Sequence, residues 1–412
     1  MVDLSALSFW ALPPEEREAA FAELRRASPV SWQRPAEGSL MPQEDELAGY
    51  WAIVRYADVL SISRDPETFC SGRGVMFEDL PEELLEASQS FLAMDDPRHR
   101  KLRGLVSSAF SPRQMRLIED GIREDASIVV AELEEDDTGD FVERVAKRLP
   151  LMTIMRMLGV PESDRERLVH YADAAVSWND PDYLRGRTPL EVTVEAMGVL
   201  HAAASELAAQ RQEQPGDDLL SALVNAEVDG ERLTQAEIAA FFVLLSVAGN
   251  DTTRHTTSHA MRALSTRPDQ RRLLLEDVEA RIDTAVEEFV RWATPVMTFR
   301  RTATRDTEIS GQAIAEGDKV ALFYGSANRD EEAFDEAGSF DVTRDPNRHL
   351  GFGGGGPHYC MGASMARTQL RALFNELLTE FPEIEVGEPT YLVGNFVDGI
   401  SKLPMEVGPR AR

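Results

Sequence analysis

One segment constrains the fold of this chain more than any other, because it predicts a helix of about 33 residues between Thr234 and Arg267. Thr234 and Glu237 are spaced as a capping box, in which each side chain accepts a hydrogen bond from the other residue's backbone amide. At 1.5 Å per residue the helix would be roughly 50 Å long, enough to cross a whole domain. Its first half, residues 238–248, is apolar on nearly every face, which predicts burial on all sides.

The apolar pattern of this helix stops at residues 249–254, which read Gly-Asn-Asp-Thr-Thr-Arg. Polar side chains inside a buried helix cost on the order of several kcal/mol unless they find partners, and a glycine weakens the helix by roughly 1 kcal/mol. One explanation is that the helix emerges into solvent at Asn250. The other is that Asp251 and Thr252 face a cavity with a ligand or reaction centre, and that the helix is locally widened beside Ala248.

The rest of the 412-residue chain is dominated by helical periodicity, with strand-like stretches at residues 50–56 and 307–323. The predicted fold class is therefore mainly α with a small β portion. Pro, Gly and Asp cluster in three candidate loops, at residues 71–83, 179–188 and 212–218. None of these loops is long enough to demand a domain boundary, so we expect one large helical domain over residues 1–412.

Charge and cysteine content restrict the function classes. The net charge of −29 argues against nucleic acid or an anionic membrane as the main partner. The two cysteines, Cys70 and Cys360, form neither a disulfide framework nor a Cys-x-x-Cys pair. The N-terminal residues contain no basic leader, and the longest apolar stretch falls short of the roughly 20 residues that cross a bilayer. We therefore expect a cytoplasmic protein without a membrane anchor.

The glycine-rich segment 349–367 admits two chemistries. Residues 351–356 formally match the dinucleotide fingerprint G-x-G-x-x-G, but a proline stands where the helix should start. The second chemistry centres on Cys360, directly before a helix expected at residues 361–380, because a helix N-terminus favours a thiolate, which is a metal ligand or a nucleophile. Glycines would let the backbone approach a flat ligand, with Phe352 packed against it. An inert buried cysteine is the remaining alternative.

This segment also carries a family pattern of a Phe, a Gly-rich turn, Cys-x-Gly and a trailing Ala-Arg. The residues on the pattern are Phe352, His358, Cys360, Gly362, Ala366 and Arg367. They resemble the heme-ligand loop of the cytochrome P450 monooxygenases. Phe352 lies eight residues before Cys360, one more than the usual spacing. A loop with one extra residue is similar to that of a soluble bacterial branch that oxidises lipids and sterols.

Further stretches are similar to motifs of the same family. Glu288 and Arg291 match its Glu-x-x-Arg signature, an i,i+3 pair on one helix face. In the family an arginine upstream of the cysteine loop completes this ion pair, and Arg344 occupies the corresponding place. Asp251 and Thr252 resemble the acid and alcohol of the oxygen-activating helix. The order of these motifs along the chain makes the resemblance specific.

The resemblance implies a cytochrome P450 fold, with the long central helix over heme b (iron protoporphyrin IX) and the iron held by Cys360. The residues implied to contact the heme are His99, Arg103, Arg301, His358, Phe352 and Ala248. His99, Arg103, Arg301 and His358 would offset the propionate charges. Arg300 is an alternative to Arg301.

The activity implied is insertion of one atom of O2 into a C–H bond, with two electrons from NAD(P)H through a ferredoxin and a ferredoxin reductase. A thiolate ligand favours cleavage of the O–O bond. Asp251 would relay protons and Thr252 would hydrogen-bond the oxygen being activated, which favours the O2 route over a peroxygenase. We also expect Arg100 and Lys101, part of a basic cluster at residues 98–103, to dock an acidic electron carrier.

The substrate is inferred from apolar residues that the resemblance places around the pocket. These residues are Met76, Phe77, Leu92, Leu245, Val296, Met297, Phe396 and Val397. Each could equally be an ordinary core residue. Together they indicate a hydrophobic small molecule such as a fatty acid, terpenoid or steroid. The alternatives are a tailoring oxidase of a polyketide or peptide product, a heme sensor without turnover, and a nicotinamide-dependent dehydrogenase.

Overall fold

The computed structural model describes residues 2–37, 49–77, 85, 90–135, 137–176, 181–228 and 230–411. With 55% helix and 12% strand, the chain has the predicted mainly α fold with a small β portion. The α-helices are α1 (Leu7–Trp10), α2 (Pro14–Ala27), α3 (Tyr56–Ser63), α5 (Arg98–Ala109), α6 (Pro112–Ala131), α7 (Arg148–Met157), α8 (Glu162–Val176), α9 (Pro181–Leu184), α10 (Pro189–Glu213), α11 (Leu219–Val224), α12 (Gln235–Thr266), α13 (Pro268–Leu275), α14 (Val278–Ala293), α15 (Tyr324–Ala327) and α16 (Ala363–Glu380).

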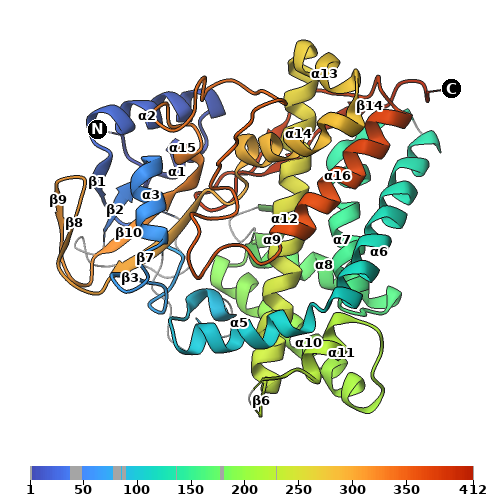
Figure 1. Cartoon of the computed structure of the whole chain (residues 1–412), viewed down its shortest axis with the longest axis horizontal. Helices are drawn as coiled ribbons and strands as arrows, with labels where there is room; N and C mark the ends of the chain where they lie inside the picture. The colour runs from blue at the N-terminus through green and yellow to red at the C-terminus, as the bar shows by residue number, and fades with distance from the viewer. Residues whose placement is uncertain are drawn as a thin grey trace.

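Short turns and strands complete the fold. The turns are η2 (Ser90–Ala93), η3 (Glu132–Glu135) and the π-helical η4 (Val142–Ala146). The strands are β1 (Val30–Gln33), β2 (Tyr50–Ile53), β3 (Phe69–Cys70), β4 (Thr138–Asp140), β5 (Glu227–Val228), β6 (Glu231–Arg232), β7 (Thr298–Ala303), β8 (Thr307–Ile309), β9 (Gln312–Ile314), β10 (Lys319–Phe323), β11 (Glu385–Val386), β12 (Thr390–Tyr391), β13 (Ile400–Lys402) and β14 (Pro404–Glu406). The five-stranded sheet lies at one end of the molecule and most of the helices at the other (Figure 1).

Helix α12 runs through the helical part of the molecule (Figure 1), and its capping box is formed as predicted. The Glu237 amide donates to Thr234 Oγ1 (3.2 Å), and the Thr234 amide donates to Glu237 Oε2 (2.8 Å). The helix is α-helical over its whole length, so the widening expected beside Ala248 is absent. Instead, the Thr252 hydroxyl donates to the Ala248 carbonyl (2.8 Å), which satisfies the hydroxyl within the helix.

The five-stranded sheet has the order β1-β2-β10-β7-β3, with β10 parallel to β2 and antiparallel to β7. The strand-like stretch 50–56 ends early, because β2 stops at Ile53 and α3 begins at Tyr56. The stretch 307–323 contains β8, β9 and β10. Strand β7 carries Arg300 and Arg301 at consecutive positions, opposite Ala321 and Val320 of β10.

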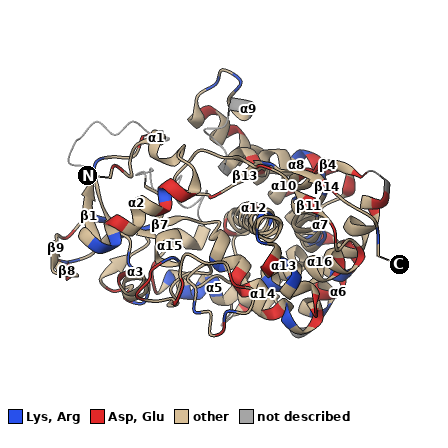
Figure 2. Ribbon diagram, turned by 90° about the horizontal axis from the view of Figure 1, so that it is seen from above, with Lys and Arg blue, Asp and Glu red and all other residues tan. Residues whose placement is uncertain are grey.

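Helix α6, which Ser111 caps, ends at Ala131 and continues as the tighter turn η3. Two of the candidate loops differ from expectation or lie partly outside the described residues. The candidate loop 179–188 contains the short helix α9, and part of the loop 71–83 lies outside the described residues. Across the described ranges, we find no helix that is both long and apolar enough to cross a membrane. Acidic segments are spread over many elements, with basic ones interspersed (Figure 2).

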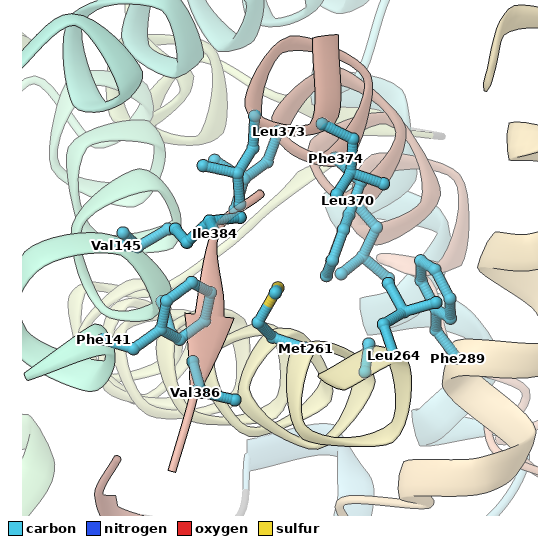
Figure 3. Packing of buried hydrophobic residues seen from close by; sticks show 14 of the residues in the cluster. Phe141, Val145, Met261, Leu264, Phe289, Leu370, Leu373, Phe374, Ile384 and Val386 are labelled. Atoms are coloured by element: carbon cyan, nitrogen blue, oxygen red, sulfur yellow. The ribbon is translucent and has the colours of Figure 1, made fainter. Parts of the chain in front are cut away.

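The largest core cluster holds α12 in place among its neighbours. Met261 and Leu264 of α12 pack with Phe289 of α14 and with residues of α16 (Figure 3). The α16 residues in this cluster are Leu370, Leu373, Phe374, Leu377 and Leu378. Because α16 begins directly after the Cys360 loop, this packing fixes the position of that loop relative to α12.

Candidate active site

The Cys360 loop connects a short irregular stretch to the N-terminus of α16. The Cys360 amide donates to the Phe352 carbonyl (3.0 Å), which closes the loop. Burial raises the pKa of the Cys360 thiol, while the amides of Gly362 and Ala363 and the charge of Arg103 oppose that rise. The Cys360 side chain is nevertheless accessible. The sulfur therefore faces open space while the N-terminal amides of α16 point at it, as the sequence predicted.

The glycine run serves the packing of this loop against α3. A Cβ atom on Gly354 would lie 2.6 Å from Ser63 Cβ, and one on Gly356 would overlap the Ser63 carbonyl oxygen. Gly356 also has a positive φ of 75°. No strand directly precedes the run among the described residues, and α16 begins only at Ala363, so the dinucleotide fingerprint is wrong. The close approach that the glycines permit is to α3, which sequence analysis did not anticipate.

His99 of α5 and His358 lie beside this loop with their ring centroids 4.2 Å apart. Burial, Arg301, His99 and Arg103 together lower the pKa of His358 to about 3. His99 is buried, and its Nε2 atom is left without a hydrogen-bond partner within the described residues. Buried polar atoms normally have partners, so this cluster fits an anionic ligand. The two propionates of heme b are anions of that kind, and the residues present fit the group.

Arg300 and Arg301, near the histidine pair, make different hydrogen bonds. Arg300 donates to the carbonyls of Arg73, Gly74 and Phe77, so it holds the segment 73–77 in place. Among the described residues, the Arg301 side chain donates a single hydrogen bond, from Nη1 to the Arg300 carbonyl (2.7 Å). This contrast favours Arg301 over Arg300 as the residue that faces an anion.

Arg103 binds the Cys360 loop directly in this structure. Its guanidinium donates to the Pro357 carbonyl (2.7 Å) and to the Tyr359 carbonyl (2.5 Å). Its charge also lowers the pKa of both His358 and Cys360. Arg103 therefore ties α5 to the residue before the cysteine and places a positive charge beside the histidine pair.

The polar break in α12 lies inside the protein. Asn250 and Asp251 are buried, with 2% and 4% exposure, so the helix does not emerge into solvent there. Ala248, one turn before Thr252, is exposed although α12 is packed against other helices along its length. Ala248 and the partly exposed Thr252 are thus accessible on one face of α12, whereas Asp251 pairs with Arg254 inside the protein. That this face of α12 meets a ligand stays a prediction.

Asp251 belongs to a buried charge network. Its carboxylate pairs with Arg254 one turn further along α12, and Arg254 Nη1 lies 3.4 Å from Asp173 Oδ1 of α8. Asn250 donates to the same Asp173 oxygen (3.1 Å), and Lys147 Nζ lies 3.7 Å from the other oxygen. Burial raises the pKa of Asp251, and Arg254 opposes the rise. Lys147 is partly exposed, so the network reaches from Asp251 toward the surface.

The Glu288, Arg291 and Arg344 constellation is assembled as the sequence pattern implied. Glu288 accepts from Arg291 at both carboxylate oxygens (2.7 Å each), and Arg344 Nε lies 3.3 Å from Glu288 Oε2. The side chains of Glu288 and Arg291 have no exposed surface. Arg291 also donates to the carbonyls of Asn328 and Ala337, so the network joins α14 to the segment before the Cys360 loop.

Sequence analysis missed a second network next to this one. Glu287 of α14 accepts from Arg367 of α16 (2.5 and 2.8 Å) and pairs with His349 (3.0 Å). The Arg367 guanidinium stacks on the Phe352 ring, 4.4 Å from its centroid. The i,i+3 signature contains Glu288 but not Glu287. No local spacing indicates an ion pair between residues that are 80 positions apart in the sequence. By contrast, the ion pair between Asp251 and Arg254 could have been predicted, because Arg254 stands three residues after Asp251 on the same helix.

The residues predicted to line the substrate pocket lie in different environments. Val296 and Val397 form an isolated antiparallel bridge, and Phe396 meets the Phe299 ring at 5.7 Å between centroids. Met297 belongs to a core cluster that Phe77 packs against. Partial exposure is found for Met76, Phe77, Leu92, Leu245, Val296, Phe396 and Val397, whereas Met297 is buried. Their contact with a substrate stays a prediction.

The predicted basic cluster on α5 is largely neutralised by the chain itself. Arg100 pairs with Asp96 (2.6 Å), Lys101 pairs with Glu231, and Arg98 Nη2 lies 3.8 Å from Glu237 Oε1. Asp96 is close in sequence, whereas Glu231 comes from β6 and Glu237 from the first turn of α12. The local positive charge at residues 98–103 is therefore smaller than the sequence suggested.

Three features together define a heme-thiolate oxygenase. A cysteine lies at a helix N-terminus, a cluster of histidines and arginines fits propionates, and a long helix carries an acid–alcohol pair. Comparison with known proteins agrees, since a family model for cytochrome P450 matches residues 53–388. The chain belongs to the cytochrome P450 family, whose members bind heme b through a cysteine thiolate. It is a monooxygenase of that family.

Two relatives and one solved structure illustrate the similarity. A methyl-branched lipid omega-hydroxylase of Mycobacterium bovis is 42% identical over 408 residues, covering 98% of this chain and 94% of that protein. A steroid C26-monooxygenase of the same species is 38% identical over 390 residues, covering 93% and 87%. The structure of Mycobacterium marinum cytochrome P450 CYP268A2 in complex with pseudoionone is 56% identical, with a TM-score of 0.94 and 98% coverage of both chains.

Proposed function

We propose that this chain hydroxylates a terminal methyl group of a methyl-branched lipid. The observation that carries the proposal is the 42% identity, over nearly the whole chain, to a methyl-branched lipid omega-hydroxylase. A sterol side chain is the second candidate, supported by the similarity to a steroid C26-monooxygenase. Both names describe oxidation at the far end of an aliphatic chain. The apolar character of Leu245, Val296, Phe396 and Val397 supports a hydrophobic substrate of either kind.

The residues of the site would share the work as follows. Cys360 would ligate the iron, and His99, Arg103, Arg301 and His358 would hold the propionates. Bound heme supplies the chemistry of O2 activation, and a thiolate ligand favours O–O cleavage. The overall reaction converts R–CH3, O2, two electrons and two protons into R–CH2OH and water.

Proton supply would be the task of the polar break in α12. Asp251 is buried and belongs to an ion-pair network with Arg254 and Asp173 that ends at the partly exposed Lys147, so its carboxyl group lies within reach of protons from the surface once it leaves Arg254. Thr252 lies on the open face of α12, where its hydroxyl can hold a proton for the reaction. A sensor without turnover has no need of such a pair, so this pair supports catalysis over sensing.

Electrons would come from NAD(P)H through a ferredoxin and its reductase in the cytoplasm. Arg64, at the end of α3, donates to the Gly354 carbonyl (3.1 Å) and is exposed on the Cys360 loop. No acidic partner of Arg64 is found among the described residues, in contrast to Arg100 and Lys101. We therefore place the centre of the docking surface for an acidic carrier at Arg64, with the α5 cations at its rim.

The activity is tested by spectroscopy and product analysis of the heme-loaded protein. Reduction under carbon monoxide should give the strongly red-shifted Soret band of thiolate-ligated heme. Binding spectra and product identification would then compare a methyl-branched fatty acid, its linear isomer and a sterol. A terminal alcohol formed from the branched acid in preference to the linear one supports the proposal. Preferred turnover of the sterol, or of neither lipid, contradicts it.

The docking surface has its own test. The Arg64→Glu variant should raise the KM for ferredoxin and weaken its salt dependence, while reduction by dithionite is unchanged. Arg272→Glu on α13 is the matched control, because it also reverses one exposed arginine. Equal effects of the two variants would rule out a special place for Arg64.

A further inference from the structure

The loop Asn395–Ile400 touches α12 through two histidines. The Ile400 amide donates to His255 Nδ1 (3.2 Å), and the Asp398 carbonyl lies 3.0 Å from His259 Nε2. His255 and His259 stand one turn apart on α12, so they present their rings on the same face. The loop is thereby tied to the helix that carries the acid–alcohol pair.

The same loop carries Phe396 and Val397, two of the predicted substrate-facing residues. The Met297 amide donates to the Phe396 carbonyl (2.8 Å), and Val397 bridges to Val296. Both side chains of the loop residues are partly exposed. A lipid that contacts Phe396 or Val397 would therefore press on a backbone that is hydrogen-bonded to α12 only three or four residues later.

The backbone of this loop lies very close to the His255 ring. A Cβ atom on Gly399 would lie 2.9 Å from His255 Cε1 and 3.0 Å from Nε2. The same Cβ would lie 2.5 Å from Leu392 Cδ1, so a larger residue at this position must displace the Leu392 side chain as well as the His255 ring. Movement of the loop at Gly399 therefore presses on both side chains.

The protonation of His255 follows from its surroundings. The ring is buried, and burial, together with the charges of Arg254 and His259, lowers the pKa of His255 well below its ordinary value. The ring is therefore neutral. Because Nδ1 accepts the Ile400 amide, the single proton resides on Nε2.

The protonated Nε2 atom faces the carboxylate of Asp251. It lies 4.0 Å from Asp251 Oδ1 and 3.4 Å from Arg254 Nη2, which itself binds that same oxygen. The Arg254 and His255 donors thus converge on one oxygen, and in this tautomer the 3.4 Å approach of Nε2 to Arg254 Nη2 sets two N–H donors against each other. A shift of about 1 Å would bring His255 to hydrogen-bond distance, so Asp251 has two alternative partners.

We propose that His255 is a positioning residue that links the substrate-facing loop Asn395–Ile400 to the carboxylate of Asp251. Displacement of the loop by a bound lipid moves Asp251 between Arg254 and His255, and so sets the fraction of consumed reductant that is recovered as product. The inference rests on the proposed hydroxylation of a lipid. It assigns a role to His255, a residue that has no hydrogen bond or ion pair with the Cys360 loop within the described part of the chain.

The test compares two glycines of the same segment. Gly399→Ala displaces the His255 ring, whereas Gly394→Ala is the matched control, because a Cβ there meets no atom within 4 Å. The measurement is product formed per NADH consumed, with a methyl-branched lipid. Gly399→Ala should lower this coupling about fivefold, the effect of one lost hydrogen bond, and Gly394→Ala should leave it unchanged.

Variants of His255 test the link from the other side. His255→Leu should lower coupling to the same extent and enlarge the solvent isotope effect on product formation, while His255→Gln, which keeps a donor, should retain more of it. Thr257→Val controls for a buried change on α12, because the Thr257 hydroxyl hydrogen-bonds only to the Thr253 carbonyl among the residues that the structure describes. The double variant Gly399→Ala/His255→Leu should lose no more coupling than either single variant.

Two outcomes would overturn the link. One is normal coupling in folded Gly399→Ala and His255→Leu. The other is a double variant whose losses multiply, since independent effects would then be acting. Failure of the proposed function is distinguishable, because it would show in the wild-type protein as an absent thiolate Soret band or absent lipid oxidation.

Discussion

The buried ion pair between Glu288 and Arg291 offers the sharpest test of how this fold is held together. Glu288→Gln keeps the shape of the side chain and removes its charge. In the wild type the two carboxylate oxygens meet donors from Arg291, Asp341 and Asn347, with Arg344 close by. A glutamine offers one oxygen to these donors and places an amide nitrogen where the second oxygen was. Arg291 would then be a buried cation without its counter-ion.

The expected cost is about 3–5 kcal/mol of unfolding free energy, the usual penalty for breaking a fully buried pair by removing one partner. This corresponds to a fall of about 10²–10⁴-fold in the ratio of folded to unfolded protein. The control is Asp120→Asn, which removes the acid of an i,i+3 pair with Arg123 on α6 that is largely exposed. That change should cost less than about 1 kcal/mol.

The assay is equilibrium unfolding in guanidinium chloride, followed by circular dichroism, with the midpoints of both variants compared with the wild type. The two pairs have the same spacing in sequence and differ in burial. If Glu288→Gln and Asp120→Asn shifted the midpoint equally, burial would not be the source of the stabilisation, and the reasoning would be refuted.

Three further outcomes are expected. Thr252→Ala should consume reductant at a normal rate while it forms little alcohol, and full coupling would refute the proton role of Thr252. Although burial opposes ionisation, hydrogen bonds from Arg367 and His349 lower the pKa of Glu287 from 4.5 to about 2, so its stabilisation is present above pH 4.5 and lost as the pH falls toward 2. Urea unfolding between these pH values should show a shallower loss for Glu287→Gln than for the wild type. Ala248→Phe should reduce the lipid-induced spectral change, because it fills the open space beside Thr252; an unaltered change would move the pocket elsewhere.

Local spacing predicted the parts of the site that one element encodes. Thr234 and Glu237 form their capping box, and Glu288 and Arg291 pair across one turn, because both spacings repeat with the helix. The position of Cys360 before α16 was predictable from the glycine and proline pattern that ends the preceding stretch. These features depend on neighbours within a few residues, so the sequence contains what is needed to infer them.

Partners from different elements were not predictable in this way. Asp173 meets Arg254 and Asn250 from α8, and Ile400 meets His255 across 145 residues. Such contacts depend on how helices pack. A single sequence does not specify which of many acidic residues will lie next to a given arginine or histidine. The widening expected in α12 failed for a similar reason, since the Ala248 carbonyl satisfies the Thr252 hydroxyl without any change in the helix.

The chain as a whole is negatively charged, whereas the residues around the Cys360 loop are positively charged. This contrast affects the binding of both the electron carrier and heme. The net charge is −29, yet Arg103, Arg301 and Arg64 gather around the Cys360 loop. We therefore expect an acidic carrier to be repelled by much of the surface and attracted at Arg64. Exposed charges are screened within about 8–10 Å at physiological salt, so ferredoxin docking should weaken as salt rises. The buried histidine–arginine cluster lies beyond such screening, so heme should remain bound over the same range of salt.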